Sequence, residues 1–173
     1  MTTPPITPNE PTASTPPPPT LQTAIESNLR YLYKDVTRLA DISAPSLILH
    51  PADRNLTTPP RAPLQGLPAA LDHELSLVAA TDNTLAMDVE SVTVSRDGQW
   101  GCVMGRLRAG RRSRDEEEEE GGFETGFCGV WRFDGMGRAV EHWENAGDAA
   151  GLGEWLRLSA KEGGEQGVKG ERE

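Results

Sequence analysis

The sequence predicts an α+β fold in which a curved antiparallel or mixed sheet packs against helices. Two segments in the N-terminal half carry apolar residues at helical spacing, and a short apolar run lies between them. After Asn83 the apolar residues recur at every second position, which indicates strands. Helices followed by an antiparallel meander form an α+β domain. A sheet that curves around helices leaves a concave end, and such places bind small molecules.

The first helix is expected from Leu21 to about residue 40, with Thr20 as its N-cap. Apolar residues follow the helical period throughout this segment, at Ile25, Leu29, Leu32 (or Tyr33), Val36 and Leu39. The sequence Ser43-Ala44-Pro45 should end the helix, because a residue before proline avoids helical geometry. A short strand is then expected from Ser46 to His50, where Pro51 ends it.

The second helix is expected from Leu67 to about Ala80, after an irregular proline-rich loop and Gly66. Its apolar stripe consists of Leu67, Leu71, Leu75 and Val78. His73 falls outside that stripe, so the pattern predicts a surface position for it.

Four strands are expected at 85–95, 99–109, 123–133 and 138–145. Asp97-Gly98 predicts a two-residue hairpin between the first pair, and residues 134–137 form a turn between the last pair. The middle pair is separated by a charged insert, residues 110–122, which is expected to be mobile. A last helix is expected from Asp148 to about Ala160.

The ends of the chain have few apolar residues, so they cannot bury enough surface to offset the entropy of ordering them. Residues 1–20 contain eight of the 14 prolines. Residues 161–173 are polar or charged except for glycines and a single valine. Both ends are therefore expected to be disordered, around one folded domain at 22–158.

Composition narrows the range of partners. The net charge of −10 disfavours nucleic acid, because phosphates repel an acidic protein. The sequence has no signal peptide pattern and no apolar stretch of about 18 residues, so a cytoplasmic protein without membrane association is expected. Its two cysteines, Cys102 and Cys128, are then expected to be reduced.

The segment from Phe133 to Glu144, Phe-Asp-Gly-Met-Gly-Arg-Ala-Val-Glu-His-Trp-Glu, resembles the closing hairpin of SnoaL-like polyketide cyclases of the nuclear transport factor 2-like superfamily. The strand ending in His50-Pro51 and the helix opened by Gly66 resemble the same family. The chain departs from the family pattern in having Glu144 where aspartate is usual, in a shorter first helical region and in its charged insert. The resemblance implies a cone-shaped domain, frequent homodimers and cofactor-free chemistry on small organic molecules.

Strand parity predicts which side chains share a face. A four-residue turn would pair Phe133 with Arg138 and Trp131 with Val140. Glu141 and Trp143 would then point the other way. The residues that would share the first face are Phe127, Gly129, Trp131, Phe133, Val140, His142 and Glu144. The resemblance to ketosteroid isomerases implies that the first face lines the pocket and that His50 occupies the position of a base.

These residues predict acid/base chemistry on a small, largely apolar carbonyl compound, as in a cyclase, isomerase or dehydratase. His50 would remove a proton beside the carbonyl, and His142 would polarise the carbonyl oxygen. Glu144 would orient His142 or act as the base. Tyr31 or Tyr33 would donate a hydrogen bond, and Phe127, Trp131 and Val140 would bind the ligand. The spacing of these residues signals neither a metal site nor a cofactor.

The alternative function is a noncatalytic ligand-binding or dimerisation module of the same fold. A pocket filled by Phe127, Trp131 and Phe133 would favour it. The opposite face of the sheet is expected to carry Trp143 beside Cys128, Val130 and Ala139, an apolar patch that a monomer avoids. A homodimer through this face is therefore predicted. The rival prediction is that the last helix folds back over Trp143.

Overall fold

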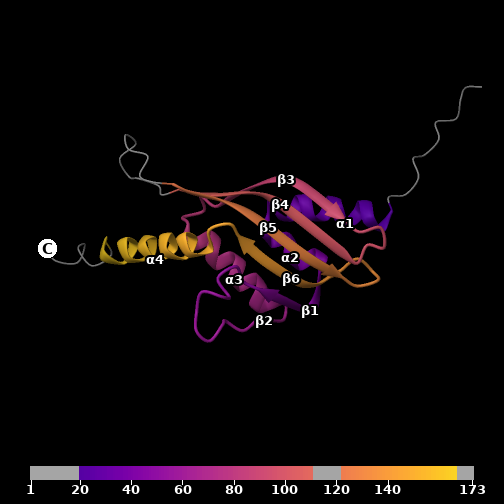
Figure 1. Ribbon diagram of the computed structural model, residues 1–173, viewed down its shortest axis with the longest axis horizontal. Helices are drawn as coiled ribbons and strands as arrows, with labels where there is room; N and C mark the ends of the chain where they lie inside the picture. The colour runs from indigo at the N-terminus through magenta and orange to yellow at the C-terminus, as the bar shows by residue number, and fades with distance from the viewer. Residues whose placement is uncertain (1–19, 111–121, 167–173) are drawn as a thin grey trace, which may run out of the picture.

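A computed structural model of the protein describes residues 20–110 and 122–166 (Figure 1). The elements in chain order are α1 (Leu21–Leu32), the 3-10 helix η1 (Val36–Arg38), α2 (Leu39–Ile42), β1 (Ser43–His50), β2 (Leu64–Gln65), α3 (Leu67–Ala80), β3 (Ala86–Val94), β4 (Trp100–Ala109), β5 (Phe123–Phe133), β6 (Ala139–Ala146) and α4 (Ala149–Gln166). The proline-rich N-terminal tail, most of the charged insert and residues 167–173 lie outside the described residues. Among the described helices, none combines the length and the apolar character needed to cross a membrane.

The strands form one mixed sheet in the order β2-β1-β6-β5-β4-β3 (Figure 1). The strands β3 to β6 are the antiparallel meander that the alternating pattern predicts. β1 joins this meander by pairing parallel with β6, and the two-residue strand β2 pairs antiparallel with β1. The predicted α+β fold is confirmed, with a mixed sheet that stays open at both edges.

The core lies between the helices and one face of the sheet, which we call the inner face. Leu29 of α1, Leu47 and Leu49 of β1 and Val103 of β4 are completely buried there. Trp131 of β5 is buried in the same cluster. Because side chains alternate along a strand, the intervening residues point to the opposite, outer face. The sheet therefore has one face that can border an internal cavity and one that faces away from the helices.

The first helical region is interrupted, although the apolar period predicts one continuous helix. α1 ends at Leu32, and the chain turns before η1 and α2. The carboxylate of Asp35 explains the turn, because it accepts hydrogen bonds from the backbone N–H and the hydroxyl of Thr37. Such local side-chain bonds compete with helical geometry. The interruption leaves Tyr33 at the C-cap of α1, where its ring packs against the core.

A β-bulge changes the predicted register of the last hairpin. Trp131 lies opposite His142, and Phe133 lies opposite Ala139, so Val140 is the extra residue between them. The predicted pairing of Trp131 with Val140 is therefore wrong. The shift at Trp131 is two residues, and a shift of two keeps His142 on the inner face as predicted. Ala139 is completely buried in the core instead of belonging to an outer patch.

Three element ends also differ from the predictions. β1 begins at Ser43 and not at Ser46, because the residues around Pro45 join the sheet. The first hairpin has a longer loop than Asp97-Gly98 suggests, since Ser95 is bonded to Trp100 across it. α4 continues to Gln166, so residues 161–166, expected in a disordered tail, are helical. Figure 1 shows α4 projecting away from the sheet beyond the end of β6.

Candidate active site

A cavity of about 1120 Å³ lies between the inner face of the sheet and the helices. Its apolar wall includes Leu85, Met87, Leu107, Phe127, Trp131 and Leu152. Tyr33 contributes a phenol, and a group of ionisable side chains, His73, Glu74, His142 and Glu144, forms one part of the lining. Cavities that are mostly apolar with a few convergent polar groups are the usual sites for small organic ligands.

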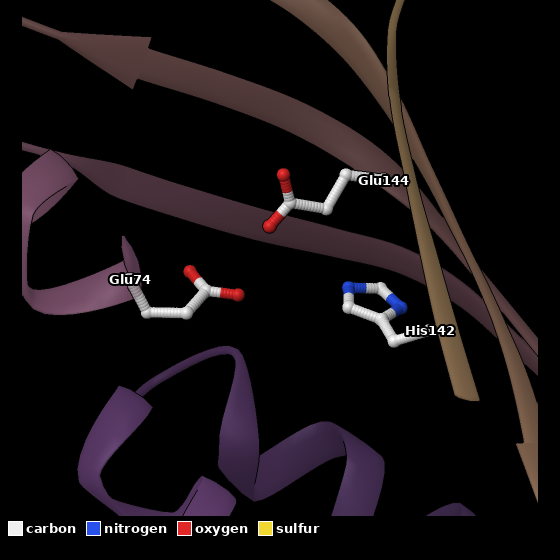
Figure 2. A group of neighbouring side chains, drawn as sticks. All are labelled: Glu74, His142 and Glu144. Carbon is white, nitrogen blue, oxygen red and sulfur yellow. The ribbon is translucent and has the colours of Figure 1, made fainter. Parts of the chain in front are cut away.

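Glu74, His142 and Glu144 form the polar cluster of this cavity, which we call the carboxylate cluster (Figure 2). One ligand atom from each of the three residues lies within 4.8 Å of the others. The two β6 residues share a face because they are two positions apart. Glu74 reaches them from α3, and Figure 2 shows all three side chains converging on one point.

Glu144 is held as an anion by its neighbours. His73 Nε2 lies 3.3 Å from Glu144 Oε2 and donates to it, and the backbone N–H of Ala52 donates to the same oxygen at 3.2 Å. Burial by itself would raise the pKa of Glu144, but the hydrogen bond with His73 holds that pKa below its ordinary value. Hydrogen bonds to a carboxylate favour its charged form.

Glu74 is the protonated partner of this carboxylate. Burial raises the pKa of Glu74 well above its ordinary value, and the charge of Glu144 and a hydrogen bond with it raise it further. Two adjacent buried carboxyl groups cannot both ionise, because each charge opposes the other. Since Glu144 has the additional donors, Glu74 retains the proton. The pair therefore combines a carboxylic acid with a carboxylate.

His142 is a neutral imidazole in a fixed orientation. It is only 3% exposed, and burial lowers its pKa to about 4. Its Nδ1 lies 3.2 Å from the carbonyl oxygen of Val130 and donates to it. The ring stacks on Trp131, with centroids 3.6 Å apart. Because Nδ1 is bonded to the backbone, Nε2 is the nitrogen that faces the two carboxyl groups in Figure 2.

Tyr33, Phe127 and Trp131 form an aromatic wall beside the cluster. Tyr33 stacks on Phe127, and Trp131 Nε1 donates a hydrogen bond to the Tyr33 hydroxyl at 3.2 Å. Burial raises the pKa of the Tyr33 phenol, so it keeps its proton. Gly129 makes this arrangement possible, because a Cβ there would overlap the Tyr33 hydroxyl. The phenol accepts from Trp131 and keeps its own O–H to donate.

Three of the predicted site residues lie outside the cavity lining. His50 points to the outer face, where its Nε2 bonds to Glu141 Oε1 at 2.9 Å and its ring stacks on Trp143. This position corrects the expectation that His50 faces a substrate in the pocket. Tyr31 is 58% exposed on α1. Val140 is the bulge residue and does not line the cavity. By contrast, Tyr33, Phe127, Trp131, His142 and Glu144 all line it.

His50 is placed on the outer face by the direction in which β1 joins the sheet. It pairs in register with Trp143, whereas Leu49 pairs with His142 and is completely buried. Because alternate residues of a strand point to opposite faces, Leu49 occupies the inner position and His50 does not. Reading β1 alone leaves both choices open, since its apolar run has no alternation.

Two residues of the site were missed by sequence reasoning. Glu74 lies within the apolar stripe of α3, at helical spacing from Leu67, Leu71 and Val78. The expectation of a surface position for His73 is wrong, because its side chain is 11% exposed and bonded to Glu144. The loop that follows β1 also contributes, through Ala52 and through Arg54, which donates to the backbone oxygen of Glu144. The available signal was a carboxylate within the apolar stripe, with an imidazole beside it in the sequence.

The carboxylate cluster is also the group of described residues that offers three ligand atoms for a cation. The proton on Glu74 removes the repulsion between the two carboxyl groups. A divalent ion there would have to displace that proton.

Comparison with known proteins relates the chain to others by structure. No protein-family pattern matches the sequence, and no curated protein matches it. Bal32a from a soil-derived mobile gene cassette superposes with a TM-score of 0.62 at 18% identity, covering 79% of this chain and 99% of Bal32a. A protein named as a SnoaL-like polyketide cyclase from Jannaschia sp. CCS1 gives 0.59 at 13% identity, covering 80% and 95%.

A steroid delta-isomerase from Pseudomonas aeruginosa gives a TM-score of 0.56 at 17% identity, covering 85% of this chain and 98% of the isomerase. Each of these matches covers nearly the whole of the other protein, so the likeness concerns the complete domain. At these identities the comparison establishes the fold and leaves the chemistry to the residues of the site. The chain has the nuclear transport factor 2-like fold that SnoaL-like polyketide cyclases share.

Proposed function

We propose that the protein is a cofactor-independent cyclase, isomerase or dehydratase that moves protons on a small, largely apolar carbonyl compound bound in the cavity. The observation that carries the proposal is the position of Glu74 and Glu144 in the cavity, where one carboxyl oxygen of each lies within 4.8 Å of the other. Burial raises the pKa of Glu74, whereas the hydrogen bond with His73 keeps the pKa of Glu144 low. When the environments of two neighbouring carboxyl groups separate their pKa values in this way, one group can act as the acid and the other as the base. The fold neighbours named as a cyclase and an isomerase support the reaction class.

Glu144 is the base in this proposal. Its carboxylate would remove a proton from the carbon next to the carbonyl group, where a small-molecule ligand is surrounded by aromatic side chains that exclude water. His73 and the N–H of Ala52 fix its position, and both donate to Oε2. A base must lie within hydrogen-bond reach of the proton it takes, so a fixed carboxylate oxygen in the cavity meets the first requirement.

Glu74 and Tyr33 are the proton donors for the oxygen that gains negative charge. Glu74 carries a proton beside Glu144, and the phenol of Tyr33 has its O–H available because its oxygen already accepts from Trp131. Donors aimed at a developing oxyanion in a site without water stabilise it more than in solution. His142 contributes a neutral ring that holds Trp131 by stacking and presents Nε2 to the cluster.

The dimensions of the cavity favour a ligand-binding function over a dimerisation module with a filled pocket. The aromatic residues Phe127 and Trp131 line a space of about 1120 Å³ and do not fill it. A space of this size accommodates a drug-sized or steroid-sized ligand. Its polar groups converge on one part of the wall, which is the arrangement that orients a ligand for chemistry.

The test is exchange of the α-proton for deuterium in bound ketones, followed by mass spectrometry. The probes are a β,γ-unsaturated ketosteroid and a set of polycyclic aromatic ketones, preselected by thermal shift because binding to the native state raises its stability. Glu144→Gln should slow exchange by about 100-fold or more. Glu141→Gln is the matched control, since Glu141 is on the same strand but on the outer face.

Equal exchange by wild type and Glu144→Gln would exclude Glu144 as the base. Loss of exchange in EDTA, with recovery on adding a divalent ion, would mean that the cluster acts through a metal and that the acid–base assignment is wrong. Binding of a ketone without exchange in any variant would favour the noncatalytic module.

We also propose that the protein is a homodimer through the outer face of the sheet. Trp143 stacks on His50 and on Trp100, and Trp100 is 46% exposed. The row of rings is therefore accessible to another molecule. Among the described side chains of α4, Leu152 and Leu156 line the cavity on the inner side, which supports a row of rings that this helix leaves uncovered. A two-fold dimer is the commonest way to bury such a patch.

A further inference from the structure

Three sulfur-containing side chains gather on the outer face, opposite the cavity. Cys102 and Met104 are two positions apart on β4, so they share a face. Cys128 of β5 lies directly across from Met104. The two thiol sulfurs, Cys102 Sγ and Cys128 Sγ, are 3.6 Å apart, and both cysteines are free and partly exposed. Met104 is 49% exposed in the single protomer, so a solute has access to the group before two protomers associate through this face.

The strand register argues against a disulfide at this position. Cys102 pairs with Val130 and Cys128 pairs with Met104, so the two cysteines are diagonal neighbours and not a directly opposed pair. Diagonal neighbours across two strands are about 7–8 Å apart. Disulfides join residues whose Cα atoms are usually about 4.4–6.8 Å apart. Closing a disulfide here would require the strands to move.

The same sulfur spacing suits two ligands of one ion. Two thiolates bound at about 2.3 Å to a single tetrahedral ion have sulfurs about 3.8 Å apart. The observed separation of 3.6 Å is close to this value and well beyond a bonded pair. Small side-chain rotations would therefore be enough for an ion to bind between Cys102 and Cys128, whereas the backbone could stay in its present register.

The neighbours of these sulfurs select for a soft ion. The residues in register with them on adjacent strands are Ser91, Thr93, Val130 and Asn145. Within the described part of the chain, this register supplies neither a carboxylate nor an imidazole to the set. The side-chain oxygens in this register are the hydroxyls of Ser91 and Thr93 and the amide of Asn145, whose Oδ1 already accepts from Arg54. Thiolate and thioether sulfurs favour ions such as Cu(I), whereas carboxylate and carbonyl oxygens favour Mg²⁺, Ca²⁺ and Mn²⁺.

We propose that Cys102, Cys128 and Met104 form a binding site for a soft monovalent metal ion of the Cu(I) type on the outer face of the sheet. The ion binds to the two cysteine sulfurs and the Met104 thioether, and thiol protons are released to solvent as it binds. The oxidation state of the metal does not change. Because the site lies on the face opposite the carboxylate cluster, it is independent of the proposed acid–base function.

The test is a competition in which the reduced full-length protein and the chromophoric chelator bicinchoninate share Cu(I) under anaerobic conditions. Wild type should withdraw one equivalent of Cu(I). Cys102→Ser and Cys128→Ser should each weaken Cu(I) binding by at least about 10–100-fold. Loss of a residue that only hydrogen-bonds to a metal ligand already costs that much. Met104→Leu should weaken it by about tenfold. Met136→Leu is the matched control, because Met136 is 76% exposed in the turn between β5 and β6.

Circular dichroism of each variant establishes that it is folded before affinities are compared. Failure of wild type to compete with the chelator would overturn the proposal, and so would unchanged affinity in both serine variants. Preferential binding of Zn²⁺ over Cu(I) would overturn the assignment to a soft ion. Peroxide treatment supplies a further arm: a mass loss of about two hydrogens, in a protein that does not bind Cu(I) when reduced, would identify a redox pair instead.

Discussion

The imidazole of His142 lies flat on the indole of Trp131, with ring centroids 3.6 Å apart and planes inclined by 10°. The two residues are directly opposed on β6 and β5, and both are almost completely buried. Stacking together with the hydrogen bond to Val130 fixes a neutral imidazole at the edge of the carboxylate cluster. Protonating this ring would place a charge in a buried site, so it should lower the free energy of unfolding.

Acidification should destabilise the protein through His142. Its folded-state pKa is lowered to about 4 by burial, below the ordinary value of 6.5. A base with a depressed pKa contributes stability above its unfolded pKa, and that contribution is lost as pH falls toward the folded pKa. Relative to His142→Gln, wild type should lose up to about 3 kcal/mol of unfolding free energy between pH 6.5 and 4, at about 1.4 kcal/mol per pKa unit. Urea denaturation at a series of pH values measures this difference, and parallel curves would contradict it.

The protonated state of Glu74 predicts the opposite trend at higher pH. Because its folded pKa is raised, its contribution is complete below the ordinary glutamate pKa and is lost as pH rises through the folded value. Glu74→Gln, which resembles the protonated acid, should therefore become more stable than wild type as pH rises. The difference should grow by about 1.4 kcal/mol for each pH unit until Glu74 ionises. Glu141→Gln should show no such growth. Burial raises the pKa of Glu141, but hydrogen bonds with His50 and Arg132 outweigh burial and keep that pKa below its ordinary value.

Gly129→Ala should disturb the aromatic wall. A Cβ at this position would overlap the Tyr33 hydroxyl and approach the His142 ring. The residues would have to shift, which typically costs about 1–3 kcal/mol in a packed core. Gly126→Ala is the matched control on the same strand, since its Cβ would meet only an ordinary contact at 3.9 Å. Thermal unfolding compares the two variants. Equal stability would show that the Tyr33 side chain can move away from Gly129 without loss of stability.

Trp143→Glu should dissociate the proposed homodimer. The substitution places a charge in the row of rings that includes His50 and Trp100, and a charge is costly at a desolvated apolar interface. Sedimentation of wild type at tens of micromolar should show a dimer, and the variant should sediment as a monomer. Met136→Glu is the control at an exposed position away from this row. A monomeric wild type would make the dimer prediction wrong, and a dimeric Trp143→Glu would place the interface elsewhere.

Local sequence patterns predicted much of the fold. Alternating apolar residues predicted the four strands of the meander within about one residue, and the helical stripe predicted α3 from Leu67 to Ala80. These patterns are reliable because a strand or helix with one buried face repeats its apolar residues at its own period. Parity along β5 and β6 likewise brought Trp131, His142 and Glu144 to the inner face, since a register shift of two residues leaves the face unchanged.

The partners of the site depend on contacts that no local pattern encodes. His73 and Glu74 reach Glu144 because α3 packs beside β1 and over the end of β6, and Tyr33 enters the cavity because Asp35 interrupts the first helix. His50 lies outside the site because β1 pairs parallel with β6 in a register that points Leu49 inward. By itself the sequence determined α3, the four strands of the meander, their order and the inward face of β6, but neither the break after Leu32 nor the short strand β2. Only the tertiary structure decided which carboxyl group lies next to Glu144, and therefore which carboxyl group keeps a proton, because that depends on burial and on charges from distant parts of the chain.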